Sequence, residues 1–145
     1  MTTGQPGGFV ARNAAAPDAE IARLISEVER LSGRGRIIHG RGEFAVALDD
    51  LIRSEEIRTT SFQSHPLLEA YGIAELLRER EVGMISPEGD RRDLARCDLG
   101  ITVADGALPE TGSVLLRTTR GQPDLLSLLP RVHLALVGPS ALLAD

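Results

Sequence analysis

The stretch "IRTTSFQSHPLLEAYGIAELLREREVGMIS" (Ile57 to Ser86) carries the pattern that decides the fold. Its first part, Ile57 to Phe62, is rich in the β-branched residues that favour a strand. The next part, His65 to Arg80, is helical in character, with Pro66 in the first turn, where proline is tolerated. Residues Glu81 to Ser86 are again typical of a strand. A strand, a helix and a strand in this order predict a βαβ unit with parallel strands.

The same alternation extends to both sides of this unit. Upstream, apolar residues recur at helical spacing between Asp18, a good N-cap, and Gly33, a good stop. Further helices are predicted over 43–54, 90–97 and 122–129, and further strands over 36–39, 100–103, 113–118 and 131–137. The whole pattern predicts an α/β fold, a mostly parallel sheet covered by helices.

The chain has the length of one domain. It contains 145 residues, of which 42% are hydrophobic, enough to form one core. Residues 1–17 are rich in Gly, Ala, Pro and Thr without any period, and we expect a disordered leader there. Residues 18–145 are predicted to form a single α/β domain.

Composition disfavours several classes of function. The formal net charge is −5, the arginines are scattered, and aromatic residues make up only 3%, which disfavours a nucleic-acid partner. No apolar run approaches the roughly 20 residues that span a bilayer, so we expect no membrane span and a cytoplasmic location. The single cysteine, Cys97, cannot form an internal disulfide, and an iron–sulfur cluster takes about four thiolates.

The segment from Asp98 to Pro123 contains the candidate site. Its glycine turns allow backbone N–H groups to approach an anion closely, and a partly buried carboxylate beside them could act as a base. The strand over 100–103 would end at the carboxyl edge of the sheet, where ligands of α/β proteins bind. The competing interpretation is that these residues only form turns. The predicted substrate-binding residues are Asp105, Glu110, Thr111, Gly112 and Ser113, with Gly121 and Gln122 as the opposite wall; no catalytic residue is assigned.

Other motifs favour structural roles. "GRGEFA" (Gly40 to Ala45) resembles a dinucleotide-binding glycine motif, but the carboxylate of Glu43 would lie where a pyrophosphate should bind. A glycine turn whose glutamate complements the helix dipole is the favoured interpretation. His65 is expected near a helix cap, His133 as a satisfied histidine of a strand and Cys97 as a small buried residue. No metal site is predicted.

The block "CDLGITVADGALPETGSVLLRTTRGQPDLLSLLPRVHLALVGPSALLAD" (Cys97 to Asp145) resembles the characteristic block of the LUD-domain family, the lactate utilization protein C group. The matching features are a strand like "DLGIT", an acid-containing turn, "ETG", a "GxP" turn, a leucine-rich helix and a strand like "LPPVHIALV". Family members continue past this block with further glycine-rich segments, so this chain would be a reduced or C-terminally truncated member.

The resemblance implies a fold similar to the NagB/RpiA/CoA-transferase-like superfamily. It also implies an accessory role in the cytoplasmic oxidation of L-lactate to pyruvate, with no cofactor on this chain and the iron–sulfur clusters on partner subunits. Two alternatives stay open. One is a stand-alone binder or enzyme for a small anionic metabolite, such as a phosphate or a CoA ester; the other is a non-catalytic interaction module.

Overall fold

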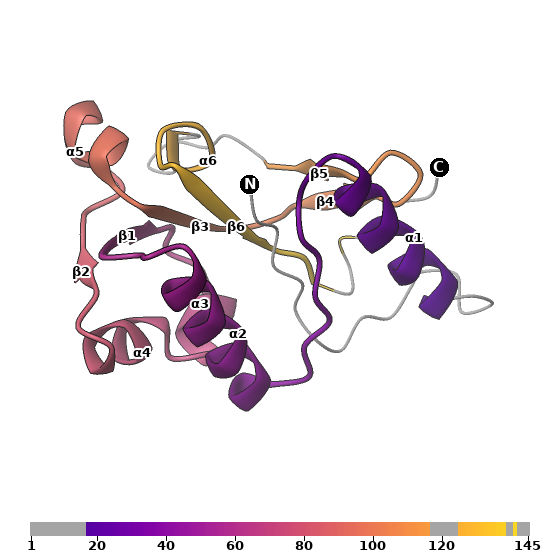
Figure 1. Cartoon of the computed structure of the whole chain (residues 1–145), viewed down its shortest axis with the longest axis horizontal. Helices are drawn as coiled ribbons and strands as arrows, with labels where there is room; N and C mark the ends of the chain where they lie inside the picture. Colours follow the sequence, from indigo (N-terminus) through magenta and orange to yellow (C-terminus); the bar gives the residue numbers. More distant parts are fainter. Residues whose placement is uncertain (1–16, 117–124, 139–140, 142–145) are drawn as a thin grey trace.

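The computed structural model describes residues 17–116, 125–138 and 141, and Figure 1 shows their arrangement. The predicted leader, 1–17, lies outside these residues except for Pro17. None of the described helices combines the length and the apolar character that are needed to cross a membrane.

The helices are α1 (Pro17–Arg30), α2 (Arg41–Ser54), α3 (Pro66–Ala70), α4 (Ile73–Glu79), α5 (Arg91–Arg96) and α6 (Leu125–Leu128). The strands are β1 (Thr59–Phe62), β2 (Gly83–Met84), β3 (Leu99–Val103), β4 (Gly106–Leu108), β5 (Ser113–Leu115) and β6 (Val132–Leu136).

The main sheet is parallel, as predicted, with the strand order β2-β1-β3-β6. Both β3 and β6 are buried along their whole length, which explains why each consists almost entirely of apolar and small residues. Helices α2, α3 and α4 cover one face of this sheet, and α5 and α6 lie on the other (Figure 1). The expected α/β class is therefore confirmed.

The larger core lies between the sheet and helices α2, α3 and α4. Alternate residues of β3 and β6 point into it, because side chains of a strand alternate between its two faces. Its fully buried members include Phe44, Leu48, Leu77, Leu99 and Ile101. The ring of Phe44 also packs on that of Tyr71, with ring centroids 5.0 Å apart.

A smaller core joins α1 to an antiparallel hairpin, β4–β5, at the carboxyl end of β3. Ile21, Leu24 and Val28 of α1 pack there with Ala104 and Ala107. The hairpin is tied to β3 because the N–H of Asp105 donates to the carbonyl of Leu115 (2.8 Å). In Figure 1, α1 and the hairpin lie together at one end of the molecule.

The structure corrects four sequence predictions. Residues 36–39 form no strand: only Ile38 is buried, Ile37 is 41% exposed, and no strand pairs with them among the described residues. The helix predicted over 65–80 is two helices, separated at Gly72, whose positive φ of 67° cannot continue an α-helix. The strand predicted over 81–86 shortens to Gly83–Met84, and β4 lies inside the segment that was expected to be a turn.

Candidate functional site: the carboxyl edge of the sheet

The strand order places a reversal between β1 and β3. From β1 the chain moves to β2 on one side, and then crosses back to β3 on the other. Ligands of open α/β sheets bind outside the carboxyl ends of strands, at such a reversal. Gln63, the first residue after β1, lies there: its backbone N–H donates to the carbonyl of Ile101 (3.1 Å), and its side-chain Oε1 accepts from the N–H of Val103 (2.8 Å). Gln63 thus bridges the ends of β1 and β3.

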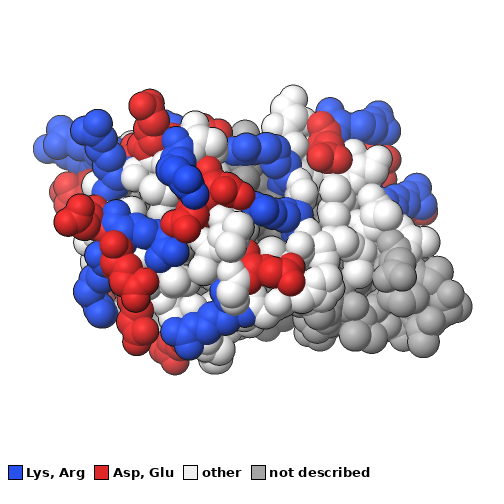
Figure 2. Space-filling view, turned by 60° about the horizontal axis from the view of Figure 1, so that its bottom comes forward, with Lys and Arg blue, Asp and Glu red and all other residues white. Residues whose placement is uncertain are grey.

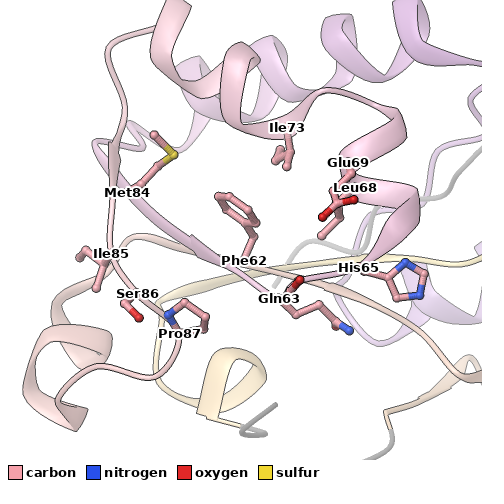
Figure 3. Close-up of a pocket in the computed structure, with 11 residues that line it drawn as sticks. Phe62, Gln63, His65, Leu68, Glu69, Ile73, Met84, Ile85, Ser86 and Pro87 are labelled. Atoms are coloured by element: carbon pink, nitrogen blue, oxygen red, sulfur yellow. The ribbon is translucent and has the colours of Figure 1, made fainter. Parts of the chain in front are cut away.

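Beside this bridge, a pocket of about 320 Å³ opens at the carboxyl ends of β1 and β2 (Figure 3). Much of its wall is apolar and comes from three separate parts of the chain: the end of β1, helices α3 and α4, and the segment after β2. Figure 3 shows the ring of Phe62 in the middle of the pocket, with Ile73 and Met84 on the side of α4 and β2. The lining residues are Phe62, Gln63, Ser64, His65, Leu68, Glu69, Ile73, Met84, Ile85, Ser86 and Pro87.

His65 and Glu69 are held in place by the start of α3. His65 is the N-cap, as predicted, and its Nδ1 accepts from the backbone N–H of Leu67 (3.0 Å). While this bond is made, Nδ1 carries no proton, so the neutral ring presents Nε2–H as a donor. Glu69 lies one turn further along, where its backbone N–H donates to the carbonyl of His65 (3.1 Å). Glu69 is the acidic residue among the described lining residues, and it is exposed.

The structure brings five of the predicted site residues together on the β4–β5 hairpin. Asp105 follows β3 at the carboxyl edge of the sheet, as expected, and is exposed. The turn between the two strands contains Glu110, Thr111 and Gly112, and Ser113 opens β5. Gly121 and Gln122, the predicted opposite wall, lie outside the described residues. None of the five lines the pocket at β1 and β2.

On the hairpin, these residues contact one another and α1. The N–H groups of Thr111 and Gly112, which we expected to face an anion, both donate to the carbonyl of Leu108 (3.3 and 3.0 Å). Glu110 pairs with Arg23 of α1 at 3.6 Å, with half of each side chain exposed. The hydroxyls of Thr111 and Ser113 lie 2.7 Å apart. Each of these contacts stabilises the hairpin or joins it to α1, and none of them involves a ligand. Substrate binding by the hairpin therefore stays a prediction.

Gly112 is required by the packing of the hairpin on α1. Its φ is +69°, and a Cβ added to it would lie 2.9 Å from the carbonyl carbon of Glu27 and 3.0 Å from the nitrogen of Val28. Only glycine allows the backbones to approach so closely in this conformation. The glycine of "ETG" therefore has a structural explanation as well as the predicted functional one.

The remaining chemically reactive side chains occupy structural positions. His133 is buried and its Nε2 lies 2.7 Å from Oγ1 of Thr102; burial lowers the pKa of His133 to about 4. Cys97 is 1% exposed, and burial raises the pKa of its thiol. Glu43 accepts a hydrogen bond from the backbone N–H of His39 (3.0 Å) in the first turn of α2, which confirms its structural interpretation. Within the described ranges, no three His, Cys, Asp or Glu side chains are grouped as metal ligands would be.

Charges on the surface are mixed rather than segregated. Figure 2 shows acidic and basic side chains interspersed over one face of the molecule. Many of them form pairs between elements, such as Arg36 with Asp50 (2.8 Å) and Arg34 with Glu55 (3.2 Å). Such exposed pairs contribute little stability individually, about 0 to 1 kcal/mol each.

The pocket was missed by sequence reasoning, although a signal for it was present. The rule that ligands collect at the carboxyl ends of parallel strands was applied to the strand before Asp105. Applied to β1, it would have pointed to "QSH" (Gln63 to His65), three polar residues directly after a buried strand. Its other walls could not be found, because they depend on which strand lies beside β1.

Comparisons with known proteins show the family of this chain. A model of the LUD domain matches residues 21–145, so the chain belongs to the LUD-domain family. Among curated proteins, the chain is similar to lactate utilization protein C of Halalkalibacterium halodurans (29% identity; 66% of this chain and 43% of that protein) and of Shouchella clausii (27%; 71% and 46%). It is also similar to lactate utilization protein B of Geobacillus kaustophilus (40% identity; 33% of this chain and 10% of that protein).

The matched regions cover only part of these relatives. The chain spans less than half the length of the lactate utilization C proteins cited above. No solved structure gives a significant match. The α/β architecture is consistent with the NagB/RpiA/CoA-transferase-like fold that the sequence resemblance implied.

Proposed function

We propose that this chain is an accessory component of the oxidation of L-lactate to pyruvate in the cytoplasm, acting beside iron–sulfur partner subunits. The observation that carries the proposal is the similarity to lactate utilization protein C along about two thirds of the chain, within a family match over residues 21–145. The second similarity, to lactate utilization protein B, supports a place in the same process.

The chemistry of Cys97 supports an accessory role. An iron–sulfur cluster is held by about four thiolates, and this chain has one cysteine. Its Sγ is buried and donates to the carbonyl of Leu99 (3.3 Å), and burial disfavours the thiolate form. We therefore assign the clusters to other subunits.

Growth tests this role directly. A strain that lacks the gene should grow more slowly on L-lactate as the carbon source, and at the normal rate on pyruvate, the product of the reaction. The gene supplied on a plasmid should restore growth on lactate. Normal growth of the deletion strain on lactate would contradict the proposal.

The same strain distinguishes between roles for the hairpin. We propose the exposed residues Asp105, Glu110 and Thr111, together with the partly buried Ser113, as contacts for a small anionic metabolite. Glu110→Ala removes one exposed ion pair, so folding should change by less than about 1 kcal/mol. Loss of growth on lactate with a folded variant would support binding or chemistry at the hairpin. Unchanged growth would favour a non-catalytic interaction module.

A further inference from the structure

The pocket at the ends of β1 and β2 has a composition that selects the charge of its ligand. The eleven lining residues that the structure describes include no Lys or Arg, and Glu69 is the acidic residue among them. A carboxylate or phosphate placed there would lose hydration without gaining a cationic partner among these residues, and would lie near Glu69. An uncharged ligand has neither cost. The described part of the lining therefore favours an uncharged ligand over a small acid such as lactate.

The apolar part of the pocket suits a flat ring. Figure 3 shows the ring of Phe62 at the centre of the lining residues, with Met84 and Ile73 to either side above it. Aromatic rings stack on one another in an offset manner, and a methionine thioether adds favourable contacts at a ring edge. At about 320 Å³, the pocket lies at the small end of the range of ligand sites.

The polar groups at its rim offer both donors and an acceptor. Oε1 of Gln63 already accepts from Val103, which directs the amide N–H groups of Gln63 to act as donors. Nδ1 of His65 is occupied by Leu67, which leaves Nε2–H as a second donor. Glu69 is an acceptor only. A ligand that fits must present an N–H group to Glu69 and an acceptor atom to Gln63 or His65.

We propose that this pocket binds an uncharged, planar nitrogen heterocycle that bears an amino group, of the aminopurine class. The ring packs against Phe62, the amino group donates to Glu69, and a ring nitrogen accepts from Gln63 or His65. This inference is independent of the role in lactate oxidation, because growth on lactate tests that role and ligand binding tests this one.

Titration calorimetry on the purified full chain tests the proposal, with adenosine, inosine, AMP and L-lactate as probes. Adenosine should bind. Inosine, which has a carbonyl in place of the amino group, should bind about tenfold more weakly, the scale of one lost hydrogen bond to a charged group. AMP should bind no more tightly than adenosine, and lactate should not bind in the pocket. Absence of adenosine binding, or equal binding of inosine, would overturn the proposal.

Two variants place the binding in this pocket. Glu69→Gln replaces an exposed carboxylate on α3 and should weaken adenosine about tenfold while leaving inosine nearly unchanged. Ser86→Phe, at another exposed lining position, should fill the space and abolish binding. Glu79→Gln, an exposed carboxylate of α4 outside the pocket, is the matched control and should bind like the parent chain. If Glu69→Gln and Glu79→Gln bind adenosine equally well, the assignment is wrong.

Discussion

His133 has a titratable ring that is buried in the sheet and lies within hydrogen-bond distance of a neighbouring strand. The ring lies on β6, 8% exposed, and its Nε2 is 2.7 Å from Oγ1 of Thr102 on β3. Burial lowers its pKa to about 4, from an ordinary value of 6.5. Between these two pH values, the ring of His133 is protonated in the unfolded chain but not in the folded chain. The free energy of unfolding therefore falls as the pH falls. We expect the free energy of unfolding to decrease by about 3 kcal/mol between pH 6.5 and pH 4 from this residue.

Denaturant unfolding at several pH values measures this effect. His133→Gln keeps an amide that can bond to Thr102 but removes the titration. Its stability at pH 7 is expected to be lower than that of the parent chain, because the fit is imperfect, but the part of the pH dependence due to His133 should be absent. Equal slopes for the two chains between pH 6.5 and pH 4 would show that His133 does not titrate as proposed.

The packing of the hairpin on α1 depends on the glycine at position 112. Gly112 has a positive φ, and a Cβ there would press on the backbone at Glu27 and Val28. Gly112→Ala should therefore destabilise the fold by about 2 to 4 kcal/mol, combining backbone strain with a forced shift of α1. Thermal or denaturant unfolding checks this.

Gly42→Ala is the matched control for this prediction. Gly42 lies in α2, and an added Cβ would meet nothing within 4 Å. Alanine favours a helix over glycine, so this change should leave stability equal or raise it by up to about 1 kcal/mol. If both variants unfolded alike, close approach at Gly112 would not be what holds the hairpin on α1.

Elements were predictable from the sequence where the local pattern determines them. The strands β1, β3 and β6 follow from short apolar or β-branched runs, and α1 and α2 from helical periodicity. The segment 36–39 has the same local character but finds no partner strand in the part of the chain that the structure describes, and a four-residue pattern does not determine pairing. The strand β4 has only three residues, Gly106–Leu108, and its first residue is a glycine, which weakens any strand signal. The pocket joins Phe62, Ile73 and Met84, whose proximity follows from the strand order alone.

At the scale of the whole molecule, the two edges of the sheet have different chemistry. The carboxyl edge holds the pocket and the hairpin. The amino edge holds a polar network around Asp98, whose Oδ2 accepts from the backbone N–H of Arg58 (2.8 Å) and of Thr59 (3.2 Å). Arg131, which precedes β6, donates to Oδ1 of Asp98 (3.4 Å) and also contacts the carbonyl of Glu56. This network connects β1, β3 and β6 to the end of α2.

Because the network lies at the edge away from the pocket, it should control stability without affecting the ligand. Asp98→Asn keeps the shape of the side chain but removes its charge, and we expect a loss of about 1 to 3 kcal/mol at pH 7. Burial opposes ionisation of Asp98, but the N–H groups of Arg58 and Thr59, together with Arg131, hold its pKa below the ordinary value of 3.8. The contribution of the carboxylate is therefore complete above that value and is lost as the pH falls through the lower pKa of the folded state.

The difference in unfolding free energy between the parent chain and Asp98→Asn should thus be constant near neutral pH and shrink below about pH 4. Denaturant unfolding across this range measures it, and adenosine titration at pH 7 on the same folded variant should give the parent affinity. A difference that persists undiminished at low pH would mean that the charge of Asp98 is not what stabilises the amino edge. A changed adenosine affinity would mean that the two edges are coupled through β1, whose first residue, Thr59, donates to Asp98 and which Gln63 directly follows in the chain.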